Sequence, residues 1–188
     1  MARIYLASSW RNPYQPQLVT RLREWGHAVY DFRYDSRSLG AAPLGHAEPP
    51  ATAFSWSEMD EDWKDWTPRE YLAQLQTSAR AAQGFIGDLR GMEWADTCIM
   101  ALPCGNSAHI ECGYMKGRGK RVIIYWERND KVTSAKNDAT GEVKTWTFEP
   151  DLMYLLGDNL VIGPSELRNA LDYGVPLERD RGNGGLSK

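Results

Sequence analysis

The 188-residue sequence lacks any apolar run that approaches the roughly 20 residues needed to cross a membrane. Its N-terminal apolar stretch is too short for a secretory signal peptide, so we expect a cytoplasmic protein. An excess of positive charge is also missing, because 22 basic side chains stand against 25 acidic ones, for a formal net charge of -3. A nucleic acid polymer or a membrane surface is therefore not an expected partner.

Cysteine is scarce, and its pattern excludes two further classes of protein. Cys98, Cys104 and Cys112 are odd in number and contain no paired metal-ligand motif, so neither a disulfide framework nor a zinc site is indicated. Reduced thiols are the preferred interpretation, and no metal or cofactor is expected. What the chain does contain is 42% hydrophobic and 25% charged residues, which is the balance of a globular protein.

The N-terminal third begins with a strand, a helix and a second strand. Residues 3–7 form a short apolar run, 13–26 place Leu18, Leu22 and Trp25 at helical spacing before a terminating glycine, and 27–32 alternate as a strand does. This order is typical of a parallel α/β sheet with right-handed crossovers.

A long segment at 33–66 interrupts this pattern and is rich in Gly, Pro, Ala and Ser. It carries Trp56, Trp63 and Trp66 among acidic residues, and a loop of this length in a compact domain is commonly a lid or a binding loop. The tryptophans are suited to stack on a flat ligand, and Trp56 is taken as a candidate binding residue. The alternative is that these rings only anchor the loop.

The middle of the chain returns to regular elements. Thr67 precedes Pro68 and Glu70 as an N-cap does, which predicts a helix from Pro68 to about Gln83. Further predicted elements are a second helical stretch over 84–94, a central apolar strand over 97–103, a helix over about 108–116 and a strand over 121–126.

The last third is less regular. We expect a polar surface excursion at 129–142, a short helix at 149–156, a last strand at 159–162, a helix from Pro164 and a polar, flexible tail at 176–188. Residues 1–175 are thus predicted to form a single α/β domain with an open parallel sheet of four to five strands flanked by helices, with the insertion at 33–66 after the second strand.

Two loops of the predicted sheet carry the chemistry. Ligands of open parallel sheets bind beyond the carboxyl ends of the strands. The loop after the first strand offers Ser8, Ser9 and Arg11, and the loop after the central strand offers Gly105, Asn106 and Ser107 before His109 and Glu111.

The start of the helix that follows the second loop has two interpretations. Backbone N–H groups over 105–107, aided by the Ser107 hydroxyl, are suited to hold a phosphate or a carboxylate. Ser107 is alternatively only an N-cap. Glu111, expected on the first turn of this helix, is either a reactive carboxylate at the crevice or a solvated acid that favours the helix dipole.

An ordered set of short motifs spans residues 3–126: Ile4-Tyr5-Leu6-Ala7-Ser8, then Asp88, then Ala95-Asp96, then Glu111-Cys112-Gly113-Tyr114, then Gly119-Lys120. This set resembles the nucleoside 2-deoxyribosyltransferase family, which includes the related deoxynucleoside 5′-monophosphate N-hydrolases. The resemblance implies a Rossmann-like or flavodoxin-like fold and an enzyme that acts on the N-glycosidic bond of a nucleoside or nucleotide.

The resemblance also implies roles for particular residues. Glu111 matches the nucleophile, Asp88 the group that protonates or hydrogen-bonds the departing base, and Asp96 a second aspartate that contacts substrate. Tyr5 would orient the nucleophile or the sugar. A carboxylate suits an anomeric carbon because it stabilises oxocarbenium charge before it bonds. Each residue also has a structural alternative: Asp88 as a surface charge, Asp96 as a cap and Tyr5 as a core ring.

Three features refine this expectation. Gly105 stands where transferases of free nucleosides carry an acid for the 5′-hydroxyl, whereas the small and hydroxyl residues of 105–107 are similar to the phosphate loop of the N-hydrolases, with Arg11 as an opposing cation. His109 is a candidate base or phosphate contact. Met153, in 149–153, matches a family segment that reaches a neighbouring subunit's site, which implies a homo-oligomer.

Two functions from different classes follow from these residues. The first is a glycosyl enzyme, either a transferase or a hydrolase, that uses Glu111. The second is a non-catalytic module that binds or senses a nucleotide on the same fold. A sensor needs no carboxylate beneath the anomeric carbon, so the presence of both Glu111 and Asp88 favours the enzyme.

Overall fold

A five-stranded parallel sheet forms the centre of the protein in a computed structural model, which describes residues 1–33, 51–136, 143–148 and 151–174. The strand order is β2-β1-β3-β4-β7, and every neighbouring pair is parallel. The strands are β1 (Arg3–Ala7), β2 (Ala28–Tyr30), β3 (Thr97–Leu102), β4 (Arg121–Trp126) and β7 (Asn159–Ile162). The predicted open parallel α/β sheet is therefore confirmed, with five strands.

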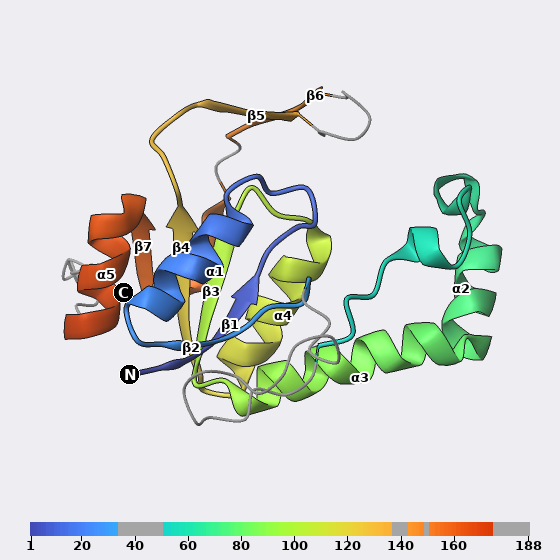
Figure 1. Ribbon diagram of the computed structural model, residues 1–188, viewed down its shortest axis with the longest axis horizontal. Coiled ribbons are helices and arrows are strands. Elements are labelled where there is room, and N and C mark those ends of the chain that lie inside the picture. Colours follow the sequence, from blue (N-terminus) through green and yellow to red (C-terminus); the bar gives the residue numbers. More distant parts are fainter. Residues whose placement is uncertain (34–50, 137–142, 149–150, 175–188) are drawn as a thin grey trace, which may run out of the picture.

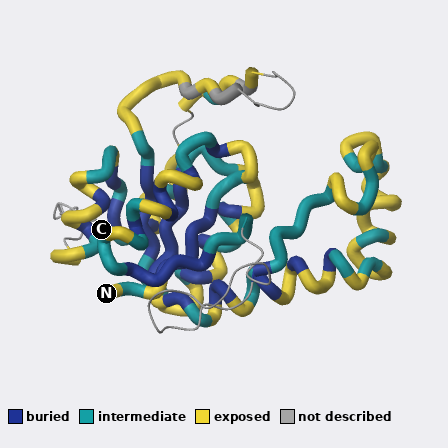
Figure 2. The backbone as a smooth tube through the Cα atoms, in the orientation of Figure 1, coloured by how far each residue is buried: buried dark blue, intermediate teal, exposed yellow. Residues whose placement is uncertain are grey.

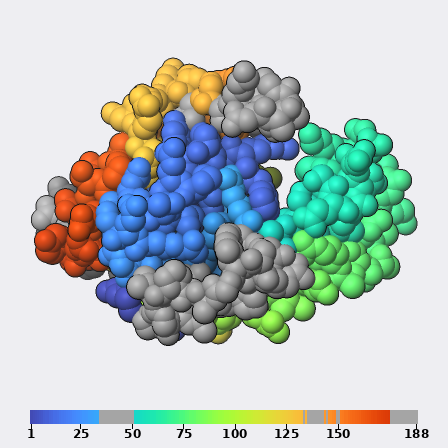
Figure 3. Space-filling model, in the orientation of Figure 1, coloured from blue at the N-terminus to red at the C-terminus, as the bar shows by residue number. Residues whose placement is uncertain are grey.

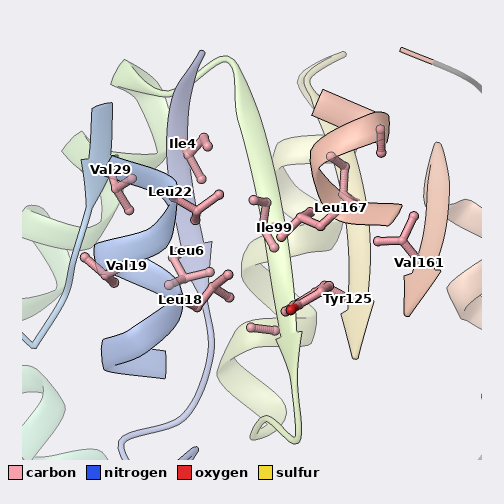
Figure 4. Close-up of a cluster of buried hydrophobic side chains, with 13 residues drawn as sticks. Ile4, Leu6, Leu18, Val19, Leu22, Val29, Ile99, Tyr125, Val161 and Leu167 are labelled. Carbon is pink, nitrogen blue, oxygen red and sulfur yellow. The ribbon is translucent and has the colours of Figure 1, made fainter. Parts of the chain in front are cut away.

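Helices cover both faces of this sheet (Figure 1). Helices α1 (Gln15–Glu24) and α5 (Gly163–Tyr173) pack on one face, and α3 (Ala79–Trp94) and α4 (Asn106–Gly117) pack on the other. The first face buries aliphatic side chains such as Leu18 and Leu167 against Ile99 (Figure 4). Burial on both faces explains why the central strands read as continuous apolar runs.

Strand alternation sorts side chains between the two faces, because successive residues of a strand point to opposite sides. Ile4 and Leu6 join the aliphatic layer beneath α1, whereas Tyr5 and Ala7 face α3 and α4. Tyr30 of β2 lies in the same layer as Tyr5. The polar chemistry of the molecule is thus gathered on the face that α3 and α4 cover.

An arm projects from the core at the start of α3 (Figure 1). It holds the short 3-10 turns η2 (Trp56–Glu58) and η3 (Trp63–Asp65) and the helix α2 (Pro68–Thr77). Trp56 lies at the centre of an aromatic cluster with Phe54, Trp66 and Tyr71, at centroid distances of 4.8, 5.8 and 5.3 Å. Figures 2 and 3 show the arm as a lobe beside the core. The burial colours of Figure 2 show no dark blue, buried segment in α2.

The helical region of the arm differs from its prediction in one respect. The start at Pro68 is confirmed by a capping box in which Thr67 and Glu70 bond each other's backbone N–H groups. The break, however, lies at Ser78 and not at Gln83. Ser78 has extended backbone, and its hydroxyl accepts from the Ala81 N–H, so it caps the start of α3. The predicted boundary at Gly84 is wrong, because Gly84 lies inside α3.

The glycines of α3 have a packing role. At Gly91, a Cβ atom would lie 2.8 Å from carbons of the Tyr30 ring, and at Gly84 it would lie 2.8 Å from Phe54. At Gly87 it would lie 3.3 Å from Thr52 and 3.4 Å from the Tyr30 hydroxyl. These positions share one face of the helix at spacings of three and four. Glycine is needed there so that the helix can approach the Tyr30 ring.

The C-terminal region corrects two further predictions. The polar excursion at 129–142 belongs in part to an antiparallel hairpin of β5 (Val132–Lys136) and β6 (Val143–Thr147), which lies over the carboxyl ends of the sheet strands (Figure 1). The predicted short helix at 149–156 is a 3-10 turn, η4 (Leu152–Leu156). The predicted tail at 176–188 and part of the insertion lie outside the described residues. Across the described part, no helix is both long and apolar enough to span a bilayer.

We predict opposite effects for two Gly→Ala substitutions on this face of the sheet. Gly91→Ala should lower the free energy of unfolding by about 1 to 3 kcal/mol, because its methyl group meets the buried Tyr30 ring. Gly113→Ala in α4 should raise it by about 0.5 kcal/mol, because nothing lies within 4 Å of its Cβ and alanine favours helix. Urea titrations of both variants test this, and an equal loss in both would contradict the packing role.

Candidate functional site

A row of polarisable side chains crosses the face of the sheet beneath α3 and α4. The strand register places Tyr30 of β2 opposite Tyr5 of β1, and Tyr5 opposite Cys98 of β3. The two tyrosine rings stack with centroids 5.4 Å apart and an interplanar angle of 11°. Both are 1% exposed. Their stacking is therefore a direct cross-strand contact, fixed by the pairing of β1 with β2.

Asp88 meets this row from α3. The Tyr30 hydroxyl donates to Asp88 Oδ1 over 3.1 Å, and no other hydrogen bond of Asp88 is found within the described ranges. Burial raises the pKa of Asp88 to about 6, and the hydrogen bond from Tyr30 opposes that rise. Asp88 is thus a half-buried carboxyl group with Oδ2 free of protein partners in the described chain, which does not fit the alternative of a plain surface charge.

Glu111 meets the same row from α4. We predicted Glu111 on the first turn of this helix. Because α4 begins at Asn106, Glu111 lies on the second turn instead. Burial and, to a smaller extent, the Asp88 charge raise the pKa of Glu111 to about 7, against the lowering effect of hydrogen bonding by the Tyr5 hydroxyl. The two carboxyl groups are therefore close enough to influence each other's ionisation, and each has a tyrosine hydroxyl beside it.

Tyr5 lies between these groups. Burial raises the pKa of its phenol well above the ordinary value, and the charges of Glu111 and Asp88 add to that rise. A phenol in this position stays protonated, so it acts as a hydrogen-bond donor. Tyr5 is two residues before the carboxyl end of β1, beneath the helices.

Cysteines lie near Glu111 on the side of β3. Cys98 Sγ and Cys112 Sγ lie 3.2 Å apart between β3 and α4, and all three thiols are free. Burial raises the pKa of Cys104 to about 12, and the charges of Cys112 and Glu111 act in the same direction. Cys98 and Cys104 are therefore protonated neighbours of Glu111.

The loop after β1 is held by its own side chains. Ser8 Oγ donates to the Ala101 carbonyl over 3.0 Å and accepts from Asn12 Nδ2, also over 3.0 Å. Ser9 Oγ accepts from the Arg11 N–H over 3.1 Å. Arg11 itself is exposed at the carboxyl edge of the sheet. Ser8 and Ser9 thus shape this loop, and their predicted contacts with substrate stay predictions.

The loop after β3 ends at an uncapped helix start. Gly105 is the N-cap of α4 and no side chain accepts from the first turn, so the interpretation of Ser107 as an N-cap is wrong. The reason is that Gly105 takes the extended cap conformation, which places Asn106 and Ser107 inside the helix. Gly105, Asn106 and Ser107 are all exposed residues at the carboxyl edge of the sheet.

His109 lies on the opposite flank of α4 from Glu111, since two residues turn a helix by about 200°. Its Nδ1 is 3.0 Å from the Gly105 carbonyl oxygen and its Nε2 is 3.3 Å from the Tyr154 hydroxyl. It lines a pocket of about 910 Å³ at the ends of β3 and β4, which includes Cys104 and Asn106 but not Glu111, Asp88 or Tyr5. That pocket does not include the two carboxyl groups whose pKa values are raised, and we place the candidate site at those groups because such perturbed carboxyl groups are the ones suited to acid and nucleophile chemistry.

Three other predicted residues lie apart from the carboxyl pair. Asp96 precedes β3, at the amino ends of the strands, where its carboxylate accepts from the Arg3 N–H at 3.2 Å and from Thr97 Oγ1 at 3.0 Å. Trp56 belongs to the aromatic cluster of the arm. Met153 lies in η4 and is 60% exposed, and its contact with a neighbouring subunit stays a prediction.

Lys120, the last residue of the motif set, has a structural position. Its Nζ donates to the carbonyl oxygens of Met92, Glu93 and Ala95 at 2.5, 2.7 and 2.7 Å. These are the last carbonyls of α3 and its C-cap. A cation there satisfies unpaired acceptors and complements the helix dipole, so Lys120 fixes the end of the helix that carries Asp88.

The sequence interpretation missed Tyr30 as a site residue. Two signals were available: Tyr5 and Tyr30 are both aromatic residues on neighbouring strands, and Gly87 and Gly91 flank Asp88 in α3. Neither signal fixes which strand residue meets which helix residue. Over the described ranges, no group of three or more His, Cys, Asp or Glu side chains is arranged to hold a metal ion.

The comparisons with known proteins yield a distant structural resemblance. No protein-family model and no curated protein matches the sequence. Among solved structures, the chain is similar to a 2-deoxyribosyltransferase from the psychrotolerant bacterium Bacillus psychrosaccharolyticus, with a TM-score of 0.38 and 22% identity. The match covers 69% of this chain and 75% of that one.

We predict that Glu111→Gln stabilises the protein in a pH-dependent way. The folded-state pKa of Glu111 is raised from 4.5 to about 7, so its proton-linked stability is present below about pH 4.5 and is lost as the pH rises through about 7. The amide avoids the buried charge. The variant should therefore gain on the order of 2 kcal/mol over wild type at pH 8 relative to pH 5. Urea titrations at both pH values measure this, and a gain independent of pH would contradict it.

Proposed function

We propose that this protein cleaves or transfers the N-glycosidic bond of a nucleoside or of its 5′-monophosphate, with Glu111 as the nucleophile. The observation that carries the proposal is the pair of half-buried carboxyl groups, with pKa values of about 7 and about 6, on two helices over one tyrosine stack. Paired carboxyl groups whose pKa values lie near neutrality are the groups that glycoside chemistry needs. The motif order of the sequence points to the same chemistry.

The two carboxyl groups would divide the reaction between them. Ionised Glu111 attacks the anomeric carbon as the bond to the base lengthens, and its charge stabilises the oxocarbenium character that develops there. Protonated Asp88 gives its proton to the departing base, which leaves as a neutral molecule. Water or a second base then displaces Glu111 from the sugar. The choice between them decides whether the product is that of a hydrolase or of a transferase.

The protonation states required are those of a coupled pair. The working form holds one proton, on Asp88, and one negative charge, on Glu111. Each charge disfavours the other, so the protons leave in two steps that belong to the pair. With values of about 6 for Asp88 and about 7 for Glu111, the one-proton form is most populated between these two pH values. Its proton lies mainly on Glu111, so the working form is the minor tautomer of the pair, about a tenth of it. A site of this kind works near neutral pH, with loss of activity on both sides.

We predict that Glu111→Gln and Glu111→Ala fold normally and lose activity by about a hundredfold or more, because the nucleophile is removed from a half-buried position. Incubation with a panel of deoxynucleosides and their 5′-monophosphates, with and without a free base, followed by chromatography, measures this. Glu24→Gln, an equal change on exposed α1 across the sheet, is the matched control. Ligand binding without any turnover by wild type would instead favour a non-catalytic nucleotide-binding module.

The 5′ position of the substrate is proposed to carry a phosphate. Support comes from the start of α4, where Gly105 leaves the first turn uncapped and the exposed Ser107 adds a hydroxyl. Arg11 is exposed at the same carboxyl edge, on the loop after the neighbouring strand. Backbone N–H groups, a hydroxyl and an arginine together suit a phosphate monoester.

We predict that a 5′-monophosphate is a better substrate than its nucleoside by about tenfold or more in kcat/KM, the value of one surviving charge-assisted hydrogen bond. Ser107→Ala and Arg11→Ala should each reduce this preference and leave turnover of the free nucleoside nearly unchanged. Steady-state kinetics on matched nucleoside and monophosphate pairs measure the ratio. Equal efficiency on both forms by wild type would sink the phosphate assignment.

A further inference from the structure

The Tyr30 hydroxyl has a single acceptor. The ring is buried between Tyr5 on one side and the glycine face of α3 on the other. Its hydroxyl donates to Asp88 Oδ1 over 3.1 Å, and no other acceptor for it is found in the described part of the chain. A buried phenol keeps its proton, because both burial and the nearby Asp88 charge raise its pKa far above neutrality. Tyr30 is therefore a fixed donor toward one oxygen of Asp88.

A fixed donor decides which oxygen of the acid carries the proton. A carboxyl oxygen that accepts a hydrogen bond from a phenol does not hold the acidic proton along the same line, because two hydrogens would then occupy it. The proton is instead held on Oδ2, which has no protein partner among the described residues. Tyr30 thus makes the two oxygens of Asp88 unequal.

We propose that Tyr30 is a positioning residue for Asp88: by donating to Oδ1 it keeps the transferable proton on Oδ2, where the departing base meets it. The inference rests on the proposed function, in which Asp88 is the acid. In the step itself, the Oδ2–H bond breaks, its proton goes to a nitrogen of the base, and the electron pair of the C–N bond goes with the base. Asp88 is left as a carboxylate, which the Tyr30 hydrogen bond stabilises, and it regains a proton from solvent.

The fold provides the geometry for this role. Tyr30 ends β2, its ring is held by the stack with Tyr5, and Gly87 and Gly91 lie on either side of Asp88 in α3. A side chain at Gly91 would strike the ring, so the small residues around Asp88 allow the hydroxyl to reach it. Tyr30, Asp88 and the glycine face therefore form one unit that sets the direction of the acid.

The first experiment measures the ionisation of Asp88 without any substrate. Carboxyl carbons of aspartate are labelled with carbon-13, Asp88 is assigned by Asp88→Asn, and its titration is followed by NMR in wild type and in Tyr30→Phe. Loss of the donor should move the Asp88 midpoint upward from about 6, because the hydrogen bond holds that pKa down. Tyr125→Phe removes a buried phenol that bonds Glu127 on the opposite face, and it should leave Asp88 unchanged.

The second experiment separates proton donation from other effects. Turnover of 2′-deoxyguanosine 5′-monophosphate is compared with turnover of its N7-methyl derivative, whose base already carries a positive charge and leaves without an acid. Tyr30→Phe should lower the maximal rate on the first substrate by about tenfold or more, leave the second within about threefold, and move the alkaline limb of the pH profile upward. Tyr125→Phe should alter neither substrate.

The outcomes are distinguishable. An unmoved Asp88 midpoint in Tyr30→Phe, or an equal loss on both substrates, would overturn the positioning role. If wild type turns over neither substrate, the proposed function fails for this substrate class, while the NMR titration still tests whether Tyr30 controls Asp88.

Discussion

The close approach of α3 to the Tyr30 ring is the constraint on which the rest of the site depends. A helix normally keeps its neighbours at the distance that its side chains impose. Here Gly87 and Gly91 remove those side chains over the ring, so the backbone of α3 comes down on a strand residue. Asp88, which lies between them, is carried inward with the helix and reaches a buried hydroxyl. Without that approach its carboxyl group would remain in solvent.

Burial of two carboxyl groups over one face of a sheet opposes folding above the pH at which they ionise. The structure limits that cost by placing a phenol beside each of them. It does not remove the cost, because neither carboxyl group has a cation at hydrogen-bonding distance within the described residues. An arginine or lysine in this place would stabilise the fold and return both pKa values to the acidic range. The free energy of unfolding is thus lowered by the same two carboxyl groups, Asp88 and Glu111, that the proposed reaction uses as acid and nucleophile.

The sequence predicts the parts of this architecture that local patterns encode. The apolar run at 97–103 predicts a buried parallel strand, and Thr67 with Pro68 and Glu70 predicts a capped helix start; both are confirmed. Ser78 was not recognised as a break, because a single serine followed by alanines favours helix on both sides. The pairing of β5 with β6 was missed because the polar composition of these two strands gives no clear alternation.

The site shows the same division between local and distant signals. Glu111 and Asp88 were found through motifs, but the hydrogen bond between Tyr30 and Asp88 joins residues 58 positions apart. No short pattern contains such a pair. Its only trace in the sequence is the set of glycines in α3, the first of which was placed at a predicted helix boundary, as fits the low helix propensity of glycine. In α3, however, glycine is needed inside the helix because it packs against the Tyr30 ring. That ring lies on β2, so the sequence of α3 alone does not reveal this.

The continuity of α3 has a mechanical consequence. The helix is 16 residues long, or about 24 Å, and it runs from the aromatic arm at Ser78 to the carbonyls that Lys120 clamps. The first end of α3 carries the arm, the last end is held by Lys120, and Asp88 lies between them. The arm and Asp88 are thus joined by one continuous helix. The aromatic cluster of the arm and the proposed acid are therefore carried on one rigid element, and Lys120 fixes that element at its far end.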